Sequence, residues 1–363
     1  MTAKHAESGS AFVKKDENGM VVRDRDAITQ RRRRDQPRRS IAMTGSSSVI
    51  GHRLVAELAE APYVTRVVVL DPVHPGVTGA KVSFYALDLT QPAVDARLTE
   101  VLEAEHIDTF VHLSPLEGPI HATAWAHELE RSGTMQVLHA CHKRGVSKLI
   151  SMGSALVYGA HRDNPNFLRE EHALRGMHGA HYVADQLDVE AQIEKWRAAH
   201  PDSVVTSLRA AFMVGPNTHN FVRRYLTRTF VPTVLGYDPL VQLIHENDAL
   251  AALMLAVERD VPGAFNIASE GLLRLSTAIR LAGGLPISMP YGSLRRLAGV
   301  LWALQLCEAP ASFAPLLRHL CVLDTARARR ELGFRARFNA REAILSLRAE
   351  PLPEDAKLLS EAP

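Results

Sequence analysis

Short apolar runs alternate with stretches of helical periodicity between residues 40 and 210. Six of these runs have the length and character of buried strands, at residues 41–43, 67–70, 82–87, 109–113, 148–152 and 204–208. Between them, apolar side chains recur every three or four positions and predict helices near residues 93–105, 121–144 and 182–200. Strands that alternate with helices form a parallel sheet covered on both faces. The pattern therefore predicts an α/β fold with a doubly wound, Rossmann-type parallel sheet.

The last third of the chain has a different pattern. Proline and glycine at Pro232, Pro239 and Gly263 divide it into short elements, with a candidate strand at 264–268 and an apolar helix at 294–306. We interpret this part as a smaller C-terminal α/β substrate lobe that closes over the sheet. The predicted organisation is a disordered basic arm (1–39), a Rossmann domain (40–215), the mixed substrate lobe (216–348) and a loose tail (349–363).

The segment 40–51 joins the first predicted strand to the first helix and reads Ser-Ile-Ala-Met-Thr-Gly-Ser-Ser-Ser-Val-Ile-Gly. Gly45 permits a tight turn, and Gly51 allows the helix to lie close to the strand. The backbone N–H groups of Val49 and Ile50, at the start of the helix, face the place of a pyrophosphate in a dinucleotide-binding unit. The segment therefore predicts that residues 40–215 form an NAD(P)-binding domain.

Two further residues of this strand–helix–strand unit bear on which dinucleotide binds and how tightly it binds. Asp71 ends the second strand, where a carboxylate accepts hydrogen bonds from a ribose 2′-OH, and this favours NAD over NADP. Ser48 occupies the middle glycine position, where the backbone normally approaches the phosphate. We expect the serine side chain to weaken dinucleotide binding without excluding it.

The charge of the chain is distributed unevenly. The net charge is +2, but residues 1–40 contain 11 Lys/Arg and 6 Asp/Glu, so the remainder is mildly acidic. The basic segment includes Arg31 to Arg34. A solvated tail is the favoured interpretation, ahead of contact with RNA, DNA or an anionic membrane. We expect no specific nucleic-acid partner.

Cysteine usage and hydropathy point to the compartment. The chain of 363 residues has three cysteines, Cys141, Cys307 and Cys321, without a metal-binding spacing. An odd, scattered set indicates a reducing compartment, and no metal site is expected. No apolar run reaches the roughly 18 residues of a membrane span, and the N-terminus lacks the apolar core of a signal peptide. The expected location is cytoplasmic.

Several motifs occur in an order and spacing typical of one family. They are Thr44-Gly45-x-x-Ser48-x-x-Gly51, Asp88-Leu89, His112-Leu113-Ser114, Gly133-Thr134, Ser154-Ala155-Leu156-Val157-Tyr158-Gly159 and Glu331-Leu332-Gly333-Phe334. Over about residues 40 to 345 the chain resembles the extended short-chain dehydrogenase/reductases, the NAD-dependent epimerase/dehydratase family. More closely, it is similar to proteins described as UDP-glucose 4-epimerase-like, although it is atypical.

The resemblance implies a set of site residues. Tyr182 would be the general acid/base and Ser154 would hold the same substrate oxygen, while Gln186 stands at the position of the family's catalytic lysine. The implied cofactor is NAD, with NADP less favoured. Its implied binding residues are Gly45, Ser48, Val49, Ile50, Gly51, Asp71, Asp88, Leu89, Leu113 and Ser114. The family also implies a homodimer formed through the helices at 121–144 and 182–200.

Three departures from the family pattern concern the chemistry. A neutral amide at Gln186 cannot stabilise a phenolate as a lysine does, so the tyrosine would stay near its ordinary pKa of about 10, which makes it a poor base. Glu130 replaces a family asparagine, and Val241 replaces an arginine that contacts the substrate diphosphate in many epimerases. Arg223, Arg224 and Arg228 either substitute for that arginine or form a solvated face.

Two functions remain open from the sequence. The first is an NAD-dependent epimerase/dehydratase-type oxidoreductase that acts on a nucleotide sugar or a related hydroxyl or carbonyl compound. The second is a catalytically impaired NAD(P)-binding scaffold or redox sensor. The intact Ser154 and Tyr182 favour the first function, and Gln186 and Glu130 favour the second.

Overall fold

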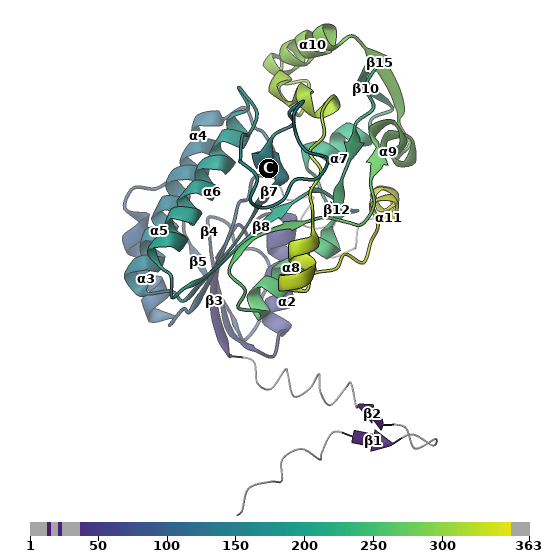
Figure 1. The fold of residues 1–363 in the computed structure, drawn as a ribbon. Coiled ribbons are helices and arrows are strands. Elements are labelled where there is room, and N and C mark those ends of the chain that lie inside the picture. The colour runs from purple at the N-terminus through teal and green to yellow at the C-terminus, as the bar shows by residue number, and fades with distance from the viewer. Residues whose placement is uncertain (1–12, 16–20, 24–36, 350–363) are drawn as a thin grey trace, which may run out of the picture.

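Seven parallel strands form the central sheet of the chain (Figure 1). The computed structural model describes residues 13–15, 21–23 and 37–349. The strand order is β13-β8-β7-β6-β3-β4-β5. The bounds are β3 (Arg39–Thr44), β4 (Val64–Asp71), β5 (Val82–Ala86), β6 (Thr109–Leu113), β7 (Lys148–Ser154), β8 (Val204–Ala210) and β13 (Gly263–Ile267). The doubly wound, Rossmann-type fold predicted from the sequence is confirmed.

Helices cover both faces of this sheet (Figure 1). On one face, α3 (Val94–Ala104), α5 (Gly133–Arg144) and α6 (His181–Ala199) bury Leu98, Val137 and Trp196 against strand residues such as Phe110 and Leu149. On the other face lie α2 (Val49–Glu60) and α8 (Glu246–Glu258). Strands covered on both faces are apolar throughout rather than alternating, which explains the continuous apolar runs in the sequence.

The helix predicted at residues 121–144 is interrupted by a wider turn. It consists of α4 (Thr123–His127), a π-helical turn at Glu128–Ser132, and α5. The turn directs Leu129 and Glu130 inward, where both are buried. Single π-helical turns inside α-helices are frequent at functional sites, and this one positions a carboxylate beside the carboxyl ends of the strands.

The smaller C-terminal lobe is built from short elements that lie at the upper right of Figure 1. Its strand pairs are β9 (Phe212–Val214) with β12 (Leu243–His245), β10 (Phe230–Val234) with β15 (Leu285–Met289), and β11 (Leu240–Val241) with β14 (Leu273–Arg274). Its helices are α7 (Phe221–Leu226), α9 (Leu275–Ala282), α10 (Tyr291–Ala303) and α11 (Ala340–Leu345). Buried Glu246 ties the lobe to the sheet domain, because its carboxylate accepts from the Asn217 side chain at 2.6 Å and pairs with Arg53 of α2 at 3.3 Å.

One predicted strand lies in a different place from the one expected. The strand predicted at 264–268 exists as β13, but it pairs in parallel with β8 at the edge of the central sheet and is not part of the smaller lobe. The crossover through α8 returns the chain to the sheet after β12, and a crossover of this kind is visible only in three dimensions. The boundary at residue 215 stays a prediction.

The two ends of the chain concern the predicted disordered arm and the predicted loose tail. Val13–Lys15 and Val21–Arg23 form a short antiparallel pair, β1 and β2, within the arm that was expected to be disordered, and Arg39 belongs to β3. Residues 1–12, 16–20 and 24–36 of that arm and residues 350–363 of the tail lie outside the described residues. Within the described part, no helix is long and apolar enough to cross a membrane.

Candidate functional site

The turn after β3 requires glycine at position 45, and the helix that follows it requires glycine at position 51. Gly45 has a φ of +77°, in the left-handed region, and a Cβ there would lie 2.3 Å from the carbonyl oxygen of Leu113. A Cβ at Gly51 would lie 2.0 Å from the carbonyl oxygen of Gly45. Any side chain at either position would collide with backbone atoms. The two positions that the sequence marked as essential for the turn therefore have that role.

Ser48 caps the helix that follows this turn. Its Oγ donates to the carbonyl of Gly45 at 2.8 Å and accepts from the N–H of Gly51 at 3.1 Å. The hydroxyl thus satisfies one of the unpaired amides at the start of α2, the usual role of an N-cap serine. Its hydrogen bonds are made within the turn, although the residue also lines the cavity described below.

Asp71 holds the turn in place. Its carboxylate accepts from the N–H of Gly45 at 2.9 Å, from the N–H of Ser46 at 2.7 Å and from the Ser46 hydroxyl at 2.6 Å. Burial raises the pKa of Asp71, and these three hydrogen bonds oppose that rise. A carboxylate offers about four acceptor positions, so contact with a ribose stays a prediction for the remaining one.

Asp88 lies after β5 and is held by its own loop. It accepts from the N–H of Thr90 at 2.9 Å and from the Thr90 hydroxyl at 2.7 Å, and the backbone hydrogen bond is the main cause that lowers its pKa. The neighbouring Leu89 is buried against Gly133, where a Cβ would lie 3.1 Å from the Leu89 Cβ. The predicted contact of both residues with adenine stays a prediction.

Glu117 is a site residue that the sequence did not reveal. It lies in the loop after β6. Burial raises the pKa of its carboxyl group, while the nearby backbone N–H groups of Val49 and His219 and the charge of Arg224 lower it. The N-terminus of a helix favours an anion, and here the anion is a side chain of the same chain. The only signal in the sequence was an acidic residue just beyond the carboxyl end of a strand.

A crevice cavity of about 110 Å³ joins the start of α2 to the predicted catalytic residues. Its lining includes Ser48 and Ile50 from α2 and its cap, Ser114 and Glu117 from the loop after β6, and Ser154, Tyr182 and Gln186. Parallel strands bring their carboxyl ends to one edge, which is why residues so distant in sequence meet here.

The two residues implied as catalytic have defined contacts in this cavity. The Ser154 Oγ accepts from the N–H of Leu156 at 3.2 Å and caps a short 3₁₀ turn. The phenol of Tyr182 donates to the carbonyl of Leu116 at 3.4 Å. Both hydroxyl groups are thus oriented by backbone groups of the loops that end β6 and β7.

Glu130 and Gln186 contact each other in the same region. The side-chain amide of Gln186 donates to the Glu130 carboxylate at 3.1 Å, and the Ser114 hydroxyl donates to its other oxygen. Burial raises the pKa of Glu130 to about 7, with the Ser114 hydrogen bond lowering it and the charge of Asp185 raising it. A buried carboxyl therefore changes charge near neutral pH beside the predicted catalytic residues.

Tyr182 lies near negative charges, whereas a lysine at position 186 would place a positive charge beside it. Burial, followed by the charges of Glu130 and Glu117, raises the pKa of the Tyr182 phenol above its ordinary value. A phenol in such a field stays protonated across the physiological range. It can therefore donate a proton or a hydrogen bond, but it cannot accept a proton at a useful rate.

Arg223 and Arg224, predicted as substrate contacts, lie on α7. The Arg223 guanidinium donates to the carbonyls of Gly215 and Pro216 at 2.5 and 2.8 Å, so it stabilises the loop before its own helix. The charge of Arg224 acts on Glu117. Neither arginine is among the residues that line the crevice cavity. Their contact with a substrate stays a prediction.

Comparison with known proteins identifies the family of the chain. The profile of the NAD dependent epimerase/dehydratase family matches residues 41–268. The chain is 32% identical over 314 residues to uncharacterized proteins of Mycobacterium tuberculosis (Rv0501) and Mycobacterium bovis (Mb0513), covering 84% of this chain and 82% of each of them. The chain belongs to the NAD dependent epimerase/dehydratase family, which confirms the resemblance found in the sequence.

Solved structures share the fold at low sequence identity. The enzyme WbmG of Bordetella bronchiseptica, solved with NAD and UDP, has a TM-score of 0.65 and 16% identity over 85% of this chain and 93% of its own. UDP-glucose 4-epimerase from Thermotoga maritima, solved with UDP-glucose, has a TM-score of 0.65 and 18% identity over 85% and 97%. UDP-glucuronic acid 4-epimerase from Bacillus cereus, solved with NAD, has a TM-score of 0.62 and 14% identity over 85% and 96%.

Proposed function

We propose that the chain is an NAD-dependent oxidoreductase that interconverts a hydroxyl and a carbonyl group on a small molecule. The observation that carries this proposal is the crevice cavity, because one space is lined both by the start of α2 and by Ser154 and Tyr182. The first feature is suited to a dinucleotide phosphate and the second to a substrate oxygen. Nucleotide sugars are candidates, since solved neighbours were crystallised with UDP and UDP-glucose.

The donor groups of the site fit an anionic cofactor. The N–H of Val49 lies near a carboxylate, that of Glu117, and it is suited to a diphosphate oxygen once Glu117 is displaced. Val49 and Ile50 would then hold the diphosphate, and Asp71 the ribose. Asp88, Leu89, Leu113 and Ser114 would enclose the adenosine side of the cleft. NAD supplies the hydride acceptor; a 2′-phosphate would meet the carboxylate of Asp71, which disfavours NADP.

The protonation state of Tyr182 assigns the phenol the role of a proton donor. Since its pKa is raised, Tyr182 is a neutral phenol that donates its proton to a carbonyl oxygen as that oxygen becomes an alkoxide. Ser154 holds the same oxygen by a hydrogen bond. The same carboxylates destabilise the phenolate that remains after proton transfer, so they make the phenol a weaker acid and slow the reaction. Ionisation of Glu130 adds a negative charge near the phenol and slows the reaction further.

The test is NADH consumption by the full-length protein with a panel of carbonyl compounds that includes 4-keto nucleotide sugars. We expect Tyr182→Phe to lower kcat by roughly 10²–10⁴-fold, the usual contribution of a positioned proton donor. Tyr237→Phe is the matched control, because Tyr237 is an exposed tyrosine of the smaller lobe. Equal turnover by Tyr182→Phe and the wild type would contradict the proposed role of the phenol.

A second candidate function is a dinucleotide-binding protein with little turnover. It is favoured by the two carboxylates that raise the pKa of Tyr182, in a site where an amide stands at the implied lysine position. Its signature would be saturable NAD binding together with turnover no faster than that of Tyr182→Phe on every carbonyl compound tested. NAD binding and the rate of NADH consumption, measured together, therefore distinguish the oxidoreductase from the binding protein.

A further inference from the structure

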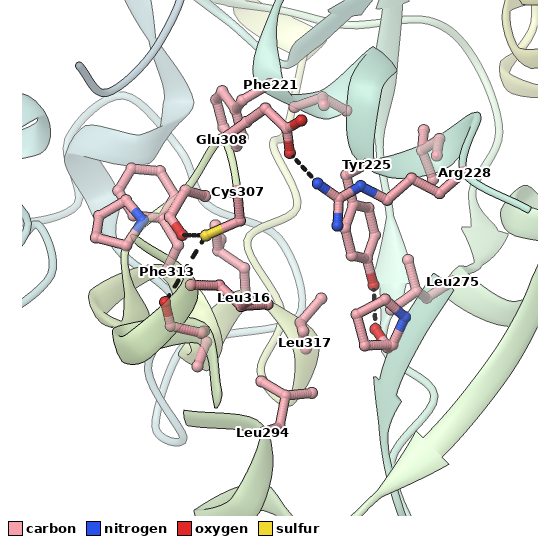
Figure 2. Close-up of a pocket in the computed structure, with 18 of the residues that line it drawn as sticks. Phe221, Tyr225, Arg228, Leu275, Leu294, Cys307, Glu308, Phe313, Leu316 and Leu317 are labelled. Carbon is pink, nitrogen blue, oxygen red and sulfur yellow. Dashed lines mark hydrogen bonds and ion pairs between the residues drawn. The ribbon is translucent and has the colours of Figure 1, made fainter. Parts of the chain in front are cut away.

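The smaller lobe contains a second cavity, of about 180 Å³, which we call the lobe cavity (Figure 2). Its walls come from α7, α9, α10 and the segment 307–317. Tyr225, Leu275, Leu294, Phe313, Leu316 and Leu317 are among the side chains that enclose it. The lining is thus predominantly aliphatic and aromatic, in contrast to the polar crevice cavity.

The polar groups that line the lobe cavity are bound to one another or to the backbone (Figure 2). The guanidinium of Arg228 pairs with the carboxylate of Glu308. The phenol of Tyr225 donates to the carbonyl of Pro232 at 2.7 Å, and the Cys307 thiol donates to the carbonyl of Ala309 at 3.3 Å. Within this lining, all of it in the described part of the chain, Arg228 is the only basic side chain, and its charge is balanced by Glu308.

This lining does not suit a nucleotide diphosphate. Val241 lines the cavity at the position where the resemblance implies a diphosphate-binding arginine. Burying phosphate charges costs free energy unless cations or hydrogen-bond donors compensate them. The Arg228 guanidinium of the lining is already paired with the Glu308 carboxylate. The chemistry of the walls favours an apolar occupant.

The size of the lobe cavity limits that occupant. An apolar cavity of about 150 Å³ in an engineered protein stays dry and binds benzene. The lobe cavity, at about 180 Å³, therefore has room for one aromatic ring or a short branched alkyl chain.

The lobe cavity adjoins the crevice cavity. Phe212, Phe221 and Val222 line both spaces. The ring of Phe221 lies edge-on to Phe212 at 6.2 Å and to Phe313 at 5.3 Å, so a row of aromatic rings forms the boundary. The lobe cavity and the space lined by Ser154 and Tyr182 therefore share part of their walls.

We propose that the lobe cavity binds the apolar part of the substrate, an aromatic ring or short alkyl chain. The carbonyl or hydroxyl group that this part bears reaches Ser154 and Tyr182 past Phe221. This inference rests on the proposed function and narrows its substrate class from nucleotide sugars to apolar alcohols and ketones. Packing of the ring against the Phe221 and Phe313 rings contributes to binding beyond the area that is buried.

Helix α10 supplies a matched pair of positions for the test. Ala298 faces the lobe cavity, whereas Val300 is 57% exposed on the outside of the same helix. Phenylalanine at position 298 would fill part of the cavity, and phenylalanine at position 300 would extend into solvent. Melting temperatures of both variants would be measured first, and Leu301→Phe would serve as a second cavity-filling variant because Leu301 also lines the cavity.

The experiment is a calorimetric titration of the full-length protein with 4-phenylbutan-2-one, with butan-2-one as the probe that lacks the ring, and with UDP. We expect the phenyl ketone to bind the wild type and Val300→Phe equally, and Ala298→Phe and Leu301→Phe at least ten-fold more weakly. We expect butan-2-one to bind far more weakly than the phenyl ketone. Equal affinity in all variants, no binding of the phenyl ketone, or UDP binding that the cavity-filling variants abolish would each overturn the proposal.

Parallel assays of NADH consumption separate this inference from the proposed function. If the phenyl ketone binds as expected but no NADH is consumed with any carbonyl compound, the apolar site is established and the oxidoreductase function fails. If NADH is consumed with other carbonyl compounds while the phenyl ketone does not bind, the oxidoreductase function stands and the apolar site is wrong.

Discussion

The side-chain amide of Gln186 donates a hydrogen bond to the Glu130 carboxylate across 3.1 Å. These two residues stand where the resemblance implies a lysine and an asparagine. Their contact means that the two departures form a single local arrangement. Where the family has a cation near the tyrosine, this chain has a carboxylate that is paired with an amide. The negative charge of this carboxylate contributes to the raised pKa of the Tyr182 phenol.

The first prediction concerns the pair of residues 130 and 186. The double variant Gln186→Lys/Glu130→Asn would place a cation near Tyr182, lower the pKa of its phenol and raise NADH-dependent turnover, by roughly 10²–10⁴-fold at most. Gln186→Lys alone should give a smaller gain, because its ammonium would pair with Glu130. Stopped-flow kinetics over pH 6–9 would measure both. Ala191→Lys, at an exposed position of α6, is the control. A double variant with unchanged turnover would contradict the electrostatic explanation.

The second prediction concerns the stability of the fold as pH changes. Folded Glu130 ionises near pH 7, whereas the unfolded chain ionises near the ordinary value of 4.5. The folded state therefore binds more protons between these values, and wild-type stability falls as pH rises through this window. The shift corresponds to up to about 3 kcal/mol.

Glu130→Gln removes this ionisation. We expect the variant to match the wild type near pH 5 and to be more stable at pH 8, as measured by urea unfolding at each pH. Glu128→Gln, at an exposed position in the same π-helical turn, should show no such dependence. A constant difference between Glu130→Gln and the wild type at all pH values would show that Glu130 ionises normally.

The third prediction concerns Glu117 at the start of α2. Because its carboxylate lies near the N–H of Val49, its negative charge competes with an anionic ligand for the start of the helix. Glu117→Gln removes the competing charge and should tighten NAD binding by roughly ten-fold, the upper range for a charge at a helix terminus. Calorimetry would compare it with Glu60→Gln, at the far end of the same helix. Weaker NAD binding by Glu117→Gln would mean that the carboxylate assists the ligand.

The fourth prediction concerns the cap of α2. Ser48→Ala leaves the N–H of Gly51 without its acceptor and should lower the free energy of unfolding by about 1 kcal/mol, whereas Ser48→Gly should cost only a few tenths. Chemical denaturation would measure both. Ser47→Ala, one residue earlier and exposed, should have little effect. If Ser48→Ala and Ser47→Ala were equally stable, the capping role would be wrong.

Local features of the sequence predicted much of this structure. Gly45 and Gly51 were recognised because a turn and a close approach impose requirements on single residues. The grouping of Ser154, Tyr182 and Gln186 came from the resemblance to a family, and the three residues line one cavity. The strand-end rule placed only Ser154 at that edge of the sheet.

Features that depend on tertiary contacts were missed. The place of β13 depends on a crossover through α8, and the π-helical turn at Glu128–Ser132 leaves no periodic signal strong enough to detect. Glu117 meets Val49 across 68 positions of sequence, and Glu130 meets Gln186 across 56. Neither contact can be inferred from spacing, because each is set by the packing of separate loops and helices.

The most direct measurement of the central claim is a calorimetric titration of the full-length protein with NAD. The account predicts saturable binding of one NAD per chain, with competition by NADH and weaker binding of NADP. Absence of heat with both NAD and NADP, in protein shown to be folded by circular dichroism, would contradict the claim that a dinucleotide binds at the start of α2.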